Sequence, residues 1–61
     1  MATFYTVTVR HTDGEEFVSR FFNTRRAAQK WARWCLTHSY TEQVSIYRGQ
    51  AGGELIERKA A

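Results

Sequence analysis

Residues 24–38, TRRAAQKWARWCLTH, restrict the fold of this 61-residue chain more than any other segment. Small and apolar side chains recur there at the i, i+3, i+4, i+7 spacing of a helix with one buried face. The predicted buried stripe consists of Thr24, Ala28, Trp31, Ala32 and Cys35, flanked by Ala27 and Leu36. Asn23 and Thr24 are both suitable N-caps. We therefore expect one helix, with the rest of the chain packed against its apolar stripe.

The remaining segments have the β-branched and aromatic composition of strands. Residues 3–10 alternate with period two, and residues 15–22 follow an Asp-Gly turn signal. Residues 43–48 and 54–58 form a second pair around the glycine-rich segment GQAGG. This order predicts one α+β domain over residues 1–61, with ββαββ order, a single antiparallel sheet and one helix packed on one face. We expect a frayed tail from about residue 59.

The register of the first hairpin decides which side chains face the helix, because a slip of one residue inverts every side chain. A two-residue turn at 13–14 would place Arg20 among valines. A three-residue turn at 12–14, with Gly14 in the left-handed conformation, lets apolar side chains share one face. We prefer this second register. Its cross-strand pairs are Val9 with Phe17, Tyr5 with Phe21, and Arg10 with Glu16, and it places Ser19 beside Val7.

The composition is that of a small globular domain without cross-links. The only cysteine excludes an intrachain disulfide, and Cys35, His11 and His38 are too few and too poorly spaced for a closed zinc site. The net charge of +3 permits a nucleic acid or an acidic protein as partner. No apolar run approaches the roughly 18 residues of a membrane span. We expect a cytoplasmic protein that uses no cofactor, no metal and no membrane.

Catalysis has little support in the sequence. Cys35 and His38 have the i, i+3 spacing that places a thiol and an imidazole on one side of a helix, as a nucleophile and its base require. Cys35, however, lies at the centre of the apolar stripe, where cysteine usually acts as a small hydrophobic residue. His11 lies in a hairpin turn, where we expect it to be exposed. The chain is therefore predicted not to be an enzyme.

The outer face of the predicted helix is basic and contains no acidic residue. Positive charge in the first turn opposes the helix dipole, and like charges at i+3 and i+4 repel, at a total cost of about 1 kcal/mol. This face is either an ordinary solvated surface or a binding surface. The predicted partner-binding residues are Arg25, Arg26, Lys30, Arg33 and Trp34. In the nucleic-acid alternative, Arg26, Lys30 and Arg33 contact phosphates.

The sheet face that the helix leaves uncovered is the second candidate interface. Aromatic and arginine side chains occur together there, as in RNA-stacking sheets and in protein interfaces. No RNP-like motif is present, so a homodimer or another protein partner is favoured over RNA. The candidate residues are Phe4, Arg10, Arg20, Phe22 and Tyr47.

Two sequence segments carry a resemblance to known proteins. FNTRRAAQKWA, followed by VSIYRG and a glycine-rich turn, resembles small ββαββ domains of uncharacterised bacterial families and phage-encoded orphan proteins. The matching residues are Phe22, Thr24, Ala28, Ala32, Val44, Ile46 and Gly49. The resemblance implies a phage or mobile-element protein that binds a host protein complex, such as a nucleic-acid-guided defence system, and modulates or inhibits it without catalysis. A basic chain departs from acidic inhibitors that mimic DNA.

Overall fold

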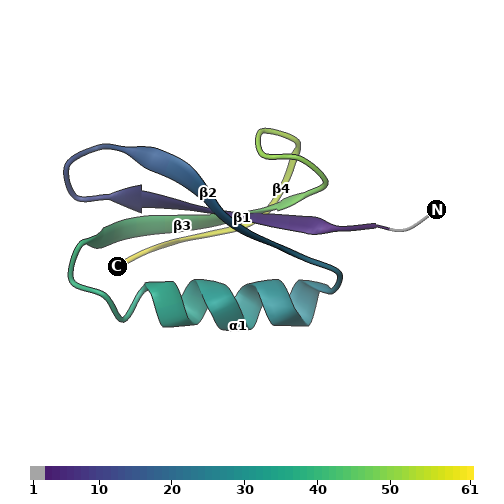
Figure 1. Ribbon diagram of the computed structural model, residues 1–61, viewed down its shortest axis with the longest axis horizontal. Coiled ribbons are helices and arrows are strands. Elements are labelled where there is room, and N and C mark those ends of the chain that lie inside the picture. Colours follow the sequence, from purple (N-terminus) through teal and green to yellow (C-terminus); the bar gives the residue numbers. More distant parts are fainter. Residues whose placement is uncertain (1–2) are drawn as a thin grey trace.

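The computed structural model describes residues 3–61 as one antiparallel sheet with one helix across one face (Figure 1). The elements are β1 (Tyr5–His11), β2 (Glu16–Phe22), α1 (Arg25–Cys35), β3 (Thr41–Arg48) and β4 (Glu54–Ala60). The strand order is β2-β1-β3-β4, so β1 and β3 are central and β2 and β4 are edges. This architecture confirms the predicted α+β fold with ββαββ order. Within the described residues, no helix is long and apolar enough to cross a membrane.

Helix α1 begins and ends with local hydrogen bonds. Thr24 is the N-cap, and its Oγ1 accepts a hydrogen bond from the backbone N–H of Ala27 at 3.2 Å. The helix ends at Cys35, earlier than the predicted His38, and the backbone N–H of His38 donates to the Cys35 carbonyl at 3.1 Å. Such i→i+3 bonds tighten the last turn. Thr24 is therefore an exposed cap rather than a member of the buried stripe.

The core lies between α1 and the two central strands. Its buried residues are Val7, Val9, Ala28, Ala32, Cys35, Val44 and Ile46. The two buried alanines let the helix backbone approach the sheet closely, and the valines and isoleucine of β1 and β3 fill the space below it. Trp31 and Leu36 are half-buried at the margins of this core.

The first hairpin has the predicted three-residue turn. The Gly14 N–H donates to the His11 carbonyl at 2.9 Å, and the His11 N–H donates to the Glu15 carbonyl at 2.7 Å. Gly14 has φ 93°, a left-handed conformation that glycine adopts without steric cost. The pairs Val9 with Phe17 and Arg10 with Glu16 follow as expected.

A β-bulge at Ser19 changes the second half of β2. Thr8 pairs with Val18 and Val7 pairs with Arg20, so Ser19 is the extra residue. The predicted pair of Tyr5 with Phe21 is therefore wrong, because Tyr5 lies opposite Phe22. Beyond the bulge, Arg20 and Phe22 face α1, whereas Phe21 faces away and contacts Phe4.

Strand β4 continues beyond the predicted boundary at residue 58. Lys59 pairs with Val44, Ala60 pairs with Gln43, and the Ala61 N–H donates to the Glu42 carbonyl at 2.9 Å. These backbone pairs correct the expectation of a frayed tail from residue 59. The tail residues lie along β3 because the antiparallel pairing continues to the start of that strand.

The sheet face opposite α1 is partly covered by the chain itself. Thr6 and Ser45 face away from the helix yet are fully buried. Thr6 Oγ1 donates to the Gly49 carbonyl, and Arg58 Nε donates to Ser45 Oγ at 3.0 Å. The β3–β4 turn stands on this side of the sheet (Figure 1). This second face is therefore not the open platform that the sequence suggested.

Candidate binding groove between β2 and α1

The outer face of α1 carries four positive charges that form no ion pair within residues 3–61. Arg25, Arg26, Lys30 and Arg33 are all exposed. The ion pairs within residues 3–61 join other basic side chains to acids, namely Arg10 to Glu42, Arg48 to Glu54 and Lys59 to Glu57. The acids of neighbouring strands therefore do not neutralise the helix. Its charges remain available to a partner.

The five predicted partner-binding residues lie in two rows on α1. Residues four positions apart lie on one side of a helix. Arg26, Lys30 and Trp34 form the row toward β2, where Trp34 stacks on Trp31. Arg25 and Arg33 share a row with Gln29, whose Nε2 donates to Glu57 Oε1 of β4 at 3.2 Å. The predicted surface is thus continuous around the helix, but only the first row borders β2.

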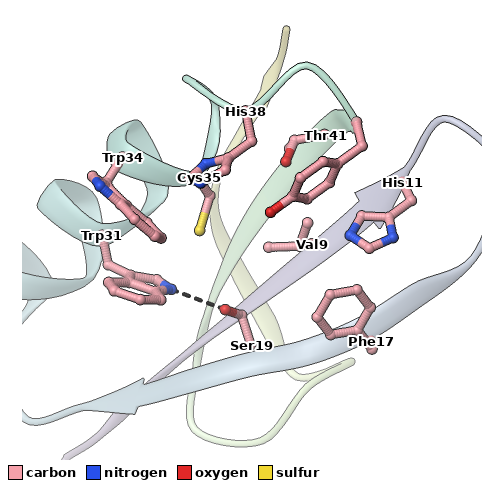
Figure 2. A pocket seen from close by; sticks show the side chains of 10 residues that line it. Val9, His11, Phe17, Ser19, Trp31, Trp34, Cys35, His38 and Thr41 are labelled. Carbon is pink, nitrogen blue, oxygen red and sulfur yellow. Dashed lines mark hydrogen bonds between the residues drawn. The ribbon is translucent and has the colours of Figure 1, made fainter.

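An aromatic cluster joins this first row to β2. Trp31 and Trp34 stack with centroids 4.8 Å apart and an interplanar angle of 28°. Trp31 also donates from Nε1 to Ser19 Oγ at 2.9 Å, so the bulged residue fixes the indole (Figure 2). Ring contacts continue on both sides of this pair. We define the aromatic cluster as Phe22, Trp31, Trp34, His38, Tyr40, His11 and Phe17, with neighbouring centroids 4.4–6.2 Å apart.

Two hollows lie along the cluster, and together they form what we call the β2–α1 groove. The first hollow, of about 390 Å³, has Phe17 and Ser19 on the β2 side and Trp31, Trp34 and His38 on the helical side (Figure 2). The second, of about 330 Å³, is lined by Phe22, Ala27, Lys30, Trp31 and Trp34. The stacked tryptophans line both hollows and separate them. Neither lining contains an acidic residue.

The chain was compared with known proteins at three levels. No protein-family model, curated protein or solved structure matches it.

Arg20 and Phe22 belong to the groove side, which corrects their predicted place on the far sheet face. The Arg20 guanidinium carbon lies 5.1 Å from the Trp31 ring centroid and 5.7 Å from that of Phe22. Arg20 is exposed, so it is not buried among valines. Its guanidinium group packs against the two rings in a cation–π arrangement. The bulge at Ser19 makes this arrangement compatible with the preferred turn.

Both histidines lie in the first hollow, which the sequence did not indicate. The His11 ring contacts Phe17 and Tyr40, with centroids 4.8 and 4.9 Å away. The Thr12 N–H donates to the Tyr40 carbonyl at 2.9 Å and ties the hairpin turn to the loop after α1. His11 is half-buried instead of exposed as predicted. No local pattern signals this contact, since the two segments are far apart in the chain.

Cys35 has the environment of a structural thiol rather than of an activated nucleophile. It is 6% exposed and points into the first hollow (Figure 2). Burial raises the pKa of the Cys35 thiol above its ordinary value of 9.0, and a hydrogen bond with Ser19 opposes this shift only in part. A nucleophilic cysteine needs the opposite shift. Within the described residues, no cluster of three or more His, Cys, Asp or Glu side chains could hold a metal ion.

The second candidate interface differs in composition from the predicted one. Phe4 and Tyr47 lie on the far sheet face as expected, and Tyr47 Oη accepts a hydrogen bond from Arg58 at 3.1 Å. Arg10 is held by Glu42 at 2.9 Å and by Gln43 at 2.8 Å. The exposed apolar side chains of this face are Phe4, Val18, Phe21 and Leu55.

Proposed function

We propose that this chain is a small non-enzymatic binding protein that engages another protein through α1 and the β2–α1 groove. The observation that carries the proposal is the set of four α1 cations without an ion pair in residues 3–61. Following the resemblance, the chain is encoded by a phage or mobile element and acts in the host cytoplasm. It modulates or inhibits a host protein complex, such as a nucleic-acid-guided defence system.

In the isolated domain, the basic face of α1 is destabilising. Unpaired like charges on one helix destabilise it by about 1 kcal/mol, a large part of the 3–5 kcal/mol typical of so small a core. A partner that supplies acidic groups removes this cost on binding. Trp34 is 53% exposed beside these charges, and Trp and Arg are the residues that most often dominate binding energy. The outer face of α1 therefore has the chemistry of an interface.

A nucleic acid is the second candidate partner. Lys30 and Trp34 lie one helical turn apart, so a cation for a phosphate adjoins a ring on which a base can stack. Single-stranded nucleic acid uses this combination without sequence preference. Binding of this kind weakens as salt is added, and the logarithm of the affinity falls linearly with the logarithm of the salt concentration.

Affinity capture from host-cell extract with matched charge variants tests the proposal. The test variant replaces Arg26, Lys30 and Arg33 by glutamine, and the control replaces the ion-paired Arg10, Arg48 and Lys59. Both variants lose three positive charges. We expect the control to retain, and the α1 variant to lose, a nuclease-resistant protein partner.

Two outcomes would contradict this function. If both variants capture the protein partner equally well, the basic face of α1 is only a solvated surface. Capture that disappears after nuclease treatment would replace the protein partner by nucleic acid.

We also propose a homodimer contact through the far sheet face. Phe21 is 60% exposed and meets Phe4 edge to face with centroids 6.1 Å apart. A symmetric contact buries such a pair against its copy. We expect sedimentation equilibrium at high micromolar concentration to show a dimer, and Phe21→Glu to show a monomer. A monomeric unmodified chain under these conditions would rule out the contact.

A further inference from the structure

We propose that the β2–α1 groove binds an extended, acidic segment of a partner protein as a fifth strand on β2. Apolar side chains of this segment occupy the two hollows, and its carboxylates face the Arg26–Lys30 row. The inference rests on the proposed function, because it names the chemistry and the binding mode of the protein partner.

Strand β2 has a free side. Within residues 3–61 it is an edge strand, with β1 on one side and no strand on the other. An edge strand presents unpaired N–H and C=O groups on its outer side, which an extended peptide can complete. The hollows adjoin this strand, since Phe17, Ser19 and Phe22 of β2 line them. Backbone pairing and side-chain insertion are therefore available in one place.

The stacked tryptophans are common to both hollows. Trp31 and Trp34 line each of them, and Trp31 is held by its hydrogen bond to Ser19. Side chains on one face of a strand recur about every 7 Å, at alternate residues. In the proposed complex, apolar side chains on the groove-facing side of the bound strand enter the two hollows. The rigid indoles limit the ordering cost of binding, because they are already stacked in the unbound chain.

The helical border of the groove is positively charged. Lys30 lines the second hollow, and Arg26 precedes it by one helical turn. Both are free of ion pairs in residues 3–61, and no acid lines either hollow. Carboxylates on a bound segment complement this border. A nucleic acid would satisfy the charges but has no amide backbone to pair with β2, so the observations favour a peptide.

The test uses a defined probe. It is an acetylated, amidated peptide in which leucine and phenylalanine lie two positions apart and glutamates lie two positions before and after this pair, with threonine at the intervening positions. The glutamates then share the groove-facing side of the strand with the apolar pair. Titration into the full chain is followed by indole fluorescence and by amide NMR shifts. We expect saturable binding, with shifts concentrated on β2 and α1.

Matched variants separate the Arg26–Lys30 row from cations elsewhere on the surface. Arg26→Glu with Lys30→Glu should weaken binding by about tenfold, because charge reversal at an interface changes complementarity directly. Arg48→Glu with Lys59→Glu makes the same change of net charge on β3 and β4, outside the groove. We expect at most about a threefold effect from that control.

Backbone pairing is tested on the probe itself. N-methylation of alternate peptide amides should abolish binding in one register and leave it nearly unchanged in the other, since only alternate amides face β2. The inference is overturned by absence of binding to the folded chain, by equal effects of the two charge variants, or by insensitivity to both methylation registers. Displacement of the probe by an oligothymidylate at the same site would overturn it in favour of nucleic acid. The proposed function is judged separately, by the capture experiment.

Discussion

Ile46→Ala is expected to leave a large fraction of the chain unfolded at room temperature. Ile46 is 1% exposed in the central strand β3 and belongs to the cluster under α1. Truncation of a buried isoleucine to alanine costs about 2–5 kcal/mol, whereas so small a core supplies about 3–5 kcal/mol. The substitution therefore removes most of the free energy of unfolding. Urea denaturation followed by circular dichroism measures the loss.

Leu55→Ala provides the control for this substitution. Leu55 is 45% exposed on the edge strand β4, so its truncation should change stability by less than about 1 kcal/mol. Comparing the two variants shows whether the loss of stability comes from the burial of the side chain or merely from the removal of a large apolar residue. If the two variants unfold at the same urea concentration, the core does not lie where α1 and β3 meet.

The Cys35 thiol is expected to react with an aromatic disulfide reagent on the order of 10²-fold more slowly in the folded protein than in the denatured chain. Two effects combine, because the sulfur is 6% exposed and burial raises its pKa, which lowers the thiolate fraction. If reaction requires opening, a stability of about 3–5 kcal/mol leaves less than about 1% of molecules reactive. Ile46→Ala should restore most of the lost reactivity.

The raised pKa of Cys35 also sets the sign of a pH effect. Above pH 9.0, the ordinary pKa, the folded chain retains the thiol proton more strongly than the unfolded chain does. Stability from this group is constant below pH 9.0 and falls as the pH rises through the folded pKa. Cys35→Ala should remove this component of the decline. Fast reaction at neutral pH would instead indicate an activated thiolate and revive a catalytic role with His38.

The parts of the fold that depend on local periodicity were predictable from the sequence. Alternation in residues 3–10 and 43–48 placed the valines and Ile46 in the core, and helical spacing did the same for Ala28 and Ala32. The basic row of the groove was also predictable, since it depends only on the helical repeat of α1.

The bulge and the aromatic cluster were not predictable in the same way. Residues 19–22, SRFF, contain aromatic side chains at adjacent positions, so both faces of β2 are equally plausible until the extra residue is located. Arg20 lies against Trp31 and remains exposed, so facing α1 does not carry the cost expected for an arginine buried among valines. His11 and His38 line the groove because the first turn contacts the loop after α1, where the Thr12 N–H donates to the Tyr40 carbonyl and His11 packs on the Tyr40 ring.

The strand order has a consequence for the sequence of folding events. The central pair β1 and β3 is separated by the whole of β2 and α1, so closing it requires a long loop. Each outer strand is instead joined by a short turn to the central strand it pairs with, so its pairing closes a much shorter loop. The β2 wall of the groove therefore depends on local closure, whereas the helical wall packs on a strand pair that forms only when distant parts of the chain meet.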